Sequence, residues 1–140
     1  MRRIKQLRYQ MNHQSSTNYP EKTIQRASRA LSCSPFQLSL FVAMRNQSVP
    51  LPTIADNKGI TNNYTKSAIA ENEAESYLIW LINVGLLRRE VDGQGLTDSF
   101  RLTPLGRTII ADWELLRAIP QPSVTDKLVN WLNRWLKWSF

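Results

Sequence analysis

The acidic residues Glu71, Glu73 and Glu75 are the densest group of side chains that could bind a metal ion or transfer protons. Both activities need carboxylates that converge on one point, whereas alternate residues of a helix point in different directions. Cys33 and His13 are the only residues of their kinds, so the sequence has no Cys/His cluster for zinc and no supported nucleophile–histidine pair. It also has no glycine-rich phosphate loop. We therefore expect a non-enzymatic protein with no cofactor and no metal.

Charge is distributed unevenly along the chain of 140 residues, which has a formal net charge of +7. Residues 1–30 contribute +6, residues 31–120 contribute −1, and residues 121–140 contribute +2. A basic arm commonly binds nucleic-acid phosphates or anionic lipid, although it can also serve only to keep a protein soluble. We expect contacts to the phosphates of double-stranded DNA from the seven basic residues of the first segment, namely Arg2, Arg3, Lys5, Arg8, Lys22, Arg26 and Arg29.

Cysteine content and hydropathy bear on the cellular compartment. Because Cys33 is the only cysteine, no disulfide can form within the chain, which fits a reducing environment. No apolar run approaches the roughly 20 residues that a membrane-spanning helix needs. The basic N-terminus is not followed by the apolar core of a secretory signal. We therefore expect a cytoplasmic protein.

Residues 21–119 have the size and apolar content of one compact domain. Residues 1–20 are basic and polar and predict a flexible arm, and residues 123–140 follow the hinge Pro120-Gln121-Pro122. The fold class that we expect is mainly α with a small β-hairpin. Apolar spacing and capping residues predict helices over 21–31, 35–47, 52–58 and 104–119, an extended segment over 49–52, and one or two helices within 62–84.

Two short runs of residues predict the hairpin. Leu87–Val91 and Ser99–Thr103 can both form strands, and we expect the polar segment Asp92–Asp98 to join them as a loop longer than a tight turn. Thr103 is expected to cap the next helix, with Pro104 in its first turn.

Three motifs carry a resemblance to a known fold. They are the helix exit Val84-Gly85-Leu86-Leu87-Arg88-Arg89, the strand-to-helix segment Phe100-Arg101-Leu102-Thr103-Pro104-Leu105-Gly106-Arg107, and Ile54-Ala55 followed by Gly59-Ile60-Thr61. Together with the element order, they resemble the winged helix-turn-helix domains of bacterial transcriptional regulators over residues 35–117. The resemblance implies that the longer helix can enter the DNA major groove while the hairpin, or wing, touches the backbone or minor groove.

The resemblance also implies a set of DNA contacts and leaves two functions open. Asn72 and Ser76 would read bases beside Lys66, while the residues flanking the hairpin would be Arg88, Arg89 and Arg101. The leading hypothesis is a small, dimeric, DNA-binding transcriptional regulator. The alternative is a winged-helix adaptor that binds another protein and no DNA, because the same helix starts with three glutamates and the expected wing carries Asp92 and Asp98.

The last segment, residues 123–140, predicts an amphipathic helix capped by Ser123 or Thr125. Its apolar side is formed by Val124, Leu128, Trp131, Leu132, Trp135, Leu136 and Trp138. Three surfaces could cover that side: the main domain, the same helix of a second copy, or a membrane surface. Packing on the domain or homodimerisation is the expected outcome, with Leu128, Trp131, Leu132, Trp135 and Trp138 as the docking residues.

Overall fold

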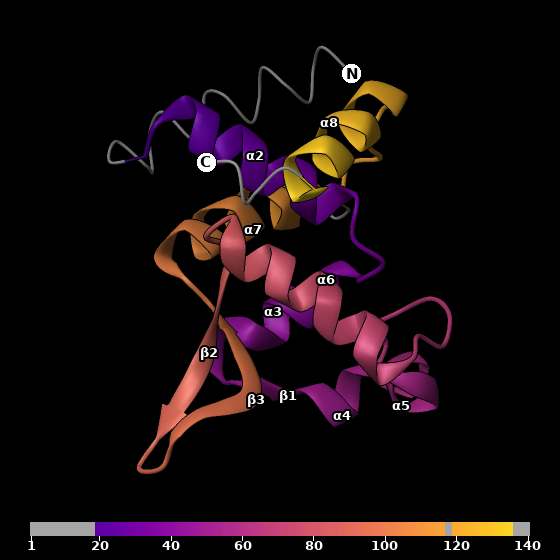
Figure 1. The fold of residues 1–140 in the computed structure, drawn as a ribbon, viewed down its shortest axis with the longest axis vertical. Coiled ribbons are helices and arrows are strands. Elements are labelled where there is room, and N and C mark those ends of the chain that lie inside the picture. The colour runs from indigo at the N-terminus through magenta and orange to yellow at the C-terminus, as the bar shows by residue number, and fades with distance from the viewer. Residues whose placement is uncertain (1–18, 117–118, 136–140) are drawn as a thin grey trace.

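The structure, a computed structural model, describes residues 19–116 and 119–135. Within these residues the fold is mainly α-helical with a small three-stranded antiparallel sheet, which confirms the predicted fold class (Figure 1). The elements are α2 (Glu21–Ser32), α3 (Leu38–Asn46), β1 (Val49–Pro50), α4 (Leu51–Ile54), α5 (Asp56–Thr61), α6 (Glu71–Asn83), β2 (Leu87–Asp92), β3 (Gly95–Leu102), α7 (Pro104–Leu116) and α8 (Val124–Trp135). The expected arm, residues 1–20, lies almost entirely outside the described residues.

The sheet has the strand order β1-β3-β2, with both neighbouring pairs antiparallel. Phe100 in the central strand faces Val49 of β1 on one side and Arg89 of β2 on the other. The hairpin extends away from the helices toward one end of the molecule (Figure 1).

The turn of the hairpin is tighter than the sequence analysis predicted. Pairing of β2 with β3 continues to Asp92 and Gly95, so Gly93 and Gln94 form the tip, and the expectation of a long polar loop is wrong. The Asp92 carboxylate accepts a hydrogen bond from the Gln94 N–H at 2.7 Å. Gly95 has a φ of +116°, a conformation that glycine adopts without the steric penalty of a Cβ atom. Of the two closely spaced glycines, Gly95 is therefore the one that the chain reversal requires.

The helix predicted to begin at Pro35 begins instead at Leu38. Phe36 is extended and forms an isolated antiparallel bridge with Thr65, so the residues before Leu38 cannot be helical. This bridge attaches the loop before α6 to the start of α3.

The single short helix predicted over residues 52–58 is two helices, α4 and α5. Ala55 is extended between them, and Asp56 has a φ of +56° while its N–H donates to the carbonyl of Ile69 at 2.8 Å. Gly59 does not end the helix as expected but lies inside α5. A Cβ atom at Gly59 would lie 2.0 Å from the carbonyl oxygen of Ile54, so the absent side chain permits close packing of the two helices.

Residues 62–84 form a loop followed by one helix, α6, which settles the question of one helix or two. Gly85 follows the helix with a φ of +89°, as expected for a C-terminal cap. At the next helix, the Thr103 hydroxyl accepts the Gly106 N–H at 3.1 Å, which confirms the predicted cap of α7. Pro104 is the first residue of α7, as expected.

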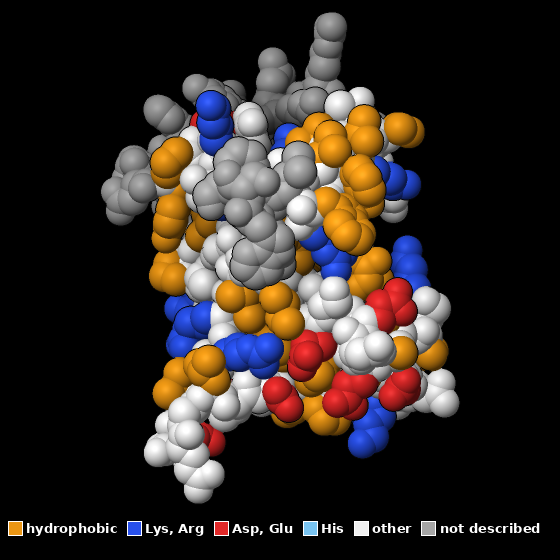
Figure 2. All heavy atoms as spheres, in the orientation of Figure 1, with side chains coloured by type: hydrophobic (Ala, Val, Ile, Leu, Met, Phe, Trp, Pro, Cys, Tyr) orange, Lys and Arg blue, Asp and Glu red, His pale blue; other side chains and the backbone are white. Residues whose placement is uncertain are grey.

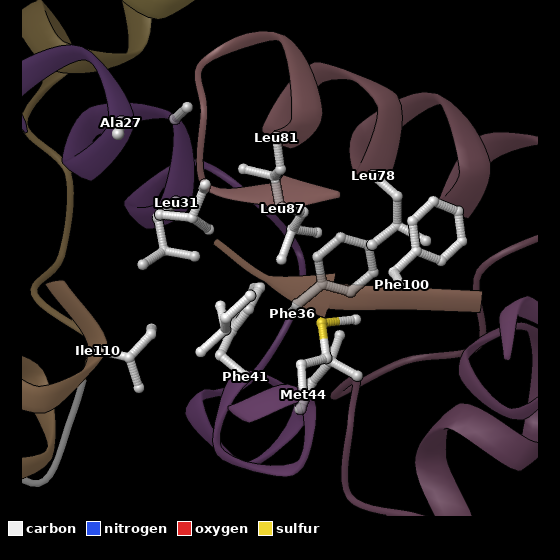
Figure 3. Packing of buried hydrophobic residues seen from close by; sticks show 14 of the residues in the cluster. Ala27, Leu31, Phe36, Phe41, Met44, Leu78, Leu81, Leu87, Phe100 and Ile110 are labelled. Carbon is white, nitrogen blue, oxygen red and sulfur yellow. The ribbon is translucent and has the colours of Figure 1, made fainter. Parts of the chain in front are cut away.

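One hydrophobic core connects α2, α3, α6, α7 and the sheet. Figure 3 shows side chains from these elements converging, among them Leu31, Phe41, Leu81 and Phe100. The ring of Phe36 packs edge-on against that of Phe41, with centroids 6.2 Å apart. Full burial of each large apolar side chain contributes roughly 1.5–3 kcal/mol to folding. The described part of α8 contributes no buried residue to this core.

Candidate interaction surfaces

The N-terminus of α8 is fixed by a reciprocal capping arrangement. The Ser123 hydroxyl accepts the Asp126 N–H at 3.0 Å, and the Asp126 carboxylate accepts the Ser123 N–H at 3.1 Å. Two N–H groups without helical partners are thereby satisfied, as in a capping box. Of the two caps that the sequence allowed, Ser123 is therefore the one used.

The polar side of α8 packs on the domain. Asp126 pairs with Arg29 of α2 at 3.6 Å. Asn130 accepts the indole N–H of Trp80 in α6 at 2.9 Å. One turn later, Arg134 donates to the Ser76 hydroxyl, and its guanidinium carbon lies 4.8 Å from the centre of the Tyr77 ring. Contacts at successive turns thus hold α8 against both α2 and α6.

Two opposing effects set the ionisation of Asp126. Desolvation alone would raise the pKa of this carboxyl, but the hydrogen bonds from Ser123 and the charge of Arg29 outweigh it and lower the pKa below its ordinary value of 3.8. Asp126 is therefore ionised at neutral pH and available to both partners.

The apolar side of α8 faces solvent. Trp131 is 54% exposed and Trp135 is 67% exposed, and Figure 2 shows hydrophobic side chains on the outer surface of this helix. The same side includes Val124, Leu128 and Leu132, all exposed. The expectation that this side packs on the domain is wrong for the described residues, because the polar side occupies that position. The other two candidates, a second copy and a membrane surface, are left for these residues, while Trp138 lies outside the described residues.

Basic residues of α2 lie beside α8. Lys22, Arg26 and Arg29 line a hollow of about 330 Å³ together with Thr23, Gln25 and, from α8, Asn133. Among these lining residues, none is acidic. Arg29 is paired with Asp126, so Lys22 and Arg26, with the amide and hydroxyl groups beside them, are the cations that can bind an anionic group such as a phosphate. The other predicted phosphate contacts, Arg2, Arg3, Lys5 and Arg8, lie outside the described residues.

Two of the three hairpin arginines are engaged within the protein. Arg101 pairs with Glu90 at 2.9 Å. Arg89 lies over the ring of Phe100, 5.0 Å from its centre, and reaches Asp98 at 3.5 Å. Arg88 is exposed on β2. The hairpin therefore offers DNA less free positive charge than the sequence analysis expected.

The start of α6 has an acidic and exposed surface. Glu71, Asn72 and Glu73 are all exposed in its first turn, and Lys66 is exposed in the preceding loop. Ser76, the second predicted base-reading residue, is the one that accepts a hydrogen bond from Arg134. Of the two predicted readers, Asn72 therefore remains accessible and Ser76 is already engaged by α8.

Among the residues that the structure describes, the predicted DNA contacts do not form one surface. Along the long axis of the molecule, α2 lies toward one end and the tip of the hairpin toward the other (Figure 1).

Within residues 19–116 and 119–135, no group of three metal-binding side chains comes together. None of the helices in these ranges is long and apolar enough to cross a membrane.

Sequence reasoning missed the residues that attach α8. Asp126, Asn130 and Arg134 follow one another at intervals of four residues, so they share one side of the helix. Trp80, the partner of Asn130, lies in an apolar run whose pattern indicated core packing. The regular spacing of these polar residues could have indicated the side of α8 that packs on the domain. The apolar side opposite them, however, favoured the prediction that the apolar side packs there.

The surface features define a small helical protein with two distinct faces: an exposed apolar stripe beside a cationic hollow, and an acidic helix start. Residues 17–134 match the profile of the family described as Npun_F0494-like, and the chain belongs to that family. No curated protein and no solved structure gives a significant match to the chain.

Proposed function

We propose that this chain is a non-enzymatic winged-helix protein that acts as an adaptor, binding a basic protein partner at the start of α6. The winged-helix assignment is supported by the order of α3, α4–α5, α6, the hairpin and α7. The short strand β1, which joins the base of the hairpin, adds to this support.

The observation that carries the adaptor function is the surface of α6. In a DNA-reading winged helix, this helix would approach a phosphate-lined groove, and binding there requires cations and donors. Glu71 and Glu73 instead place exposed carboxylates at its start, and Figure 2 shows acidic side chains gathered in this part of the molecule. Ser76 on the same helix is engaged by Arg134.

The same surface suits a partner of opposite charge. Complementary charge steers association and fixes the orientation of two proteins. A basic peptide or basic protein surface could meet Glu71 and Glu73 without the repulsion that a DNA backbone would experience. Asn72, exposed between them, offers both a donor and an acceptor.

Site-specific photo-crosslinking tests this function. A photoreactive residue at Asn72 should capture a partner that is not captured from Arg107, which is exposed on α7. Capture should be lost when Glu71→Gln and Glu73→Gln are combined, because the favourable charge is gone. Unchanged capture after both glutamates are replaced would contradict the adaptor function. Stronger binding of duplex DNA to the same variant would also contradict it.

A second candidate function is DNA binding through phosphates alone. The cationic hollow on α2 and the net charge of +6 on residues 1–30 favour it. Fluorescence anisotropy with a random-sequence duplex across a salt series tests this candidate. Roughly micromolar binding with a steep salt dependence, weakened by Lys22→Gln with Arg26→Gln and by deletion of residues 1–20, would support it. Absence of binding at low salt would reject it.

A further inference from the structure

The exposed side of α8 forms a continuous apolar stripe. The rings of Trp131 and Trp135 lie with centroids 6.0 Å apart, so the two indoles make one surface. Val124 and Leu128 extend this surface toward the start of the helix, with 83% and 55% of their area exposed. Because the polar side of α8 is hydrogen-bonded to α6, the helix is held in the orientation that presents the stripe outward.

Cations lie near the stripe on both α8 and α2. Lys127 is exposed on α8, at the position just before Leu128. On α2, Lys22 and Arg26 line the hollow that Asn133 of α8 also lines. The helix α8 itself carries few cations, and the structure places cations of α2 beside it.

We propose that the α8 stripe and the α2 cations together bind the surface of an anionic phospholipid membrane. Tryptophan and leucine side chains would enter the boundary between headgroups and acyl chains, with α8 lying in the plane of the membrane. The lysine and arginine side chains beside them would meet lipid phosphates, and the hollow could hold one headgroup. This proposal goes beyond the adaptor function and does not depend on what binds α6.

Charge favours a membrane over a second copy of the chain. A symmetric dimer places the same patch on both subunits, so the cations near the stripe of one subunit would be brought close to the cations of the other.

The combination of surfaces also favours lipid over nucleic acid. Both supply phosphates for Lys22 and Arg26. A duplex backbone, however, offers no apolar region for the exposed Trp131 and Trp135, whereas a bilayer offers one directly beneath its phosphates.

Vesicle co-sedimentation with the full chain tests the proposal. Vesicles of phosphatidylcholine with about 30% phosphatidylserine should bind the protein, and pure phosphatidylcholine should bind it far less. Combining Trp131→Gln with Trp135→Gln should lower partitioning about tenfold, and combining Lys22→Gln with Arg26→Gln should do the same. Only the Lys22→Gln and Arg26→Gln combination should also weaken the dependence of vesicle binding on salt concentration.

Matched control variants distinguish binding through the proposed surface from nonspecific adsorption to vesicles. Val91 and Leu96 on the hairpin are 58% and 74% exposed, and their replacement by Gln should leave partitioning unchanged. Lys58→Gln with Arg88→Gln removes the same charge elsewhere and should have little effect. Circular dichroism should show that all four variants remain folded, because every altered side chain is exposed.

Three results would overturn the proposal. The first is equal partitioning of the stripe variants and their controls, or no binding to either vesicle. The second is a concentration-dependent dimer in analytical ultracentrifugation that disappears in the tryptophan variant without any vesicle binding, which would assign the stripe to a second copy. The third is binding of a DNA duplex that is unchanged in the tryptophan variant, again with no vesicle binding, which would assign the cations to nucleic acid.

Discussion

The indole nitrogen of Trp80 lies 2.9 Å from the side-chain oxygen of Asn130, and this hydrogen bond joins α6 to α8. Trp80 is 5% exposed, so its N–H has little access to water and depends on Asn130. The bond therefore fixes which side of α8 faces the domain. It also leaves the opposite, apolar side outward.

Replacing Asn130 with alanine should loosen α8 without unfolding the domain. The largely buried N–H of Trp80 would lose its partner, which we expect to cost about 1 kcal/mol. Hydrogen exchange of the α8 amides should accelerate about fivefold, while exchange in α3 should not change. Thr125→Ala, on an exposed position of the same helix, serves as the control. Equal acceleration in both variants would show that the bond does not secure α8.

The orientation of α8 marks a limit of sequence analysis. An apolar side containing Leu128 and Trp131 predicts burial, because burial of apolar area stabilises a fold. The competing term comes from specific polar pairs such as Asn130 with Trp80, which helical spacing alone cannot identify because the partner lies fifty residues away in the sequence. The existence and position of the helix were predictable, but the surface that it contacts was not.

Gly106 is the glycine at which we expect substitution to be costly. A Cβ atom at this position would lie 2.3 Å from the carbonyl oxygen of Leu86, so Gly106→Ala requires α7 to move away from the segment before β2. We expect a loss of about 1–3 kcal/mol in the free energy of unfolding, measured by urea denaturation. A Cβ atom at Gly93, in the hairpin tip, would have no other atom within 4 Å, so Gly93→Ala should change the value by about 0.5 kcal/mol or less. Similar losses in both variants would contradict the packing argument.

The sequence predicted the type of the hairpin but not the length of its strands. The alternation around Phe100 and the cap at Thr103 located the returning strand and the next helix correctly. The glycines Gly93 and Gly95 indicated a chain reversal, but not how far the strand pairing would continue toward it. The role of Gly59 had no such signal, because it depends on the close approach of the Ile54 carbonyl, which only the folded chain shows.

Cys33 should react slowly with thiol reagents in the folded protein. Burial raises the pKa of its thiol above the ordinary value of 9.0, which reduces the reactive thiolate fraction at neutral pH. With a chromogenic disulfide at pH 8, we expect a lower rate than for glutathione and an increase toward the glutathione rate in denaturing urea. A folded-state rate equal to that in urea would show that the thiol is not protected by its position between α2 and α3.

The attachment of α8 should weaken in acid because of Asp126. Its folded-state pKa lies below the ordinary value of 3.8, so ionisation favours the folded arrangement. The stabilisation is fully present above that ordinary value and is lost as the pH falls through the folded-state pKa, where the pairing with Arg29 and the reciprocal cap with Ser123 lose the charge of the carboxylate. Hydrogen exchange of the α8 amides, measured from neutral pH to below 3.8 and corrected for intrinsic rates, should show faster opening at the acidic end.

The Asp126→Asn variant isolates this carboxyl from the others. An asparagine can still accept the Ser123 N–H, but it carries no charge for Arg29, so α8 should open more readily at neutral pH and respond less to acid. Lys127→Gln alters a neighbouring charge that does not take part in the cap and should retain the acid response. If Asp126→Asn and the unaltered protein open with the same pH dependence, the acid sensitivity of α8 arises at another group, and the ion pair with Arg29 contributes nothing measurable to its attachment.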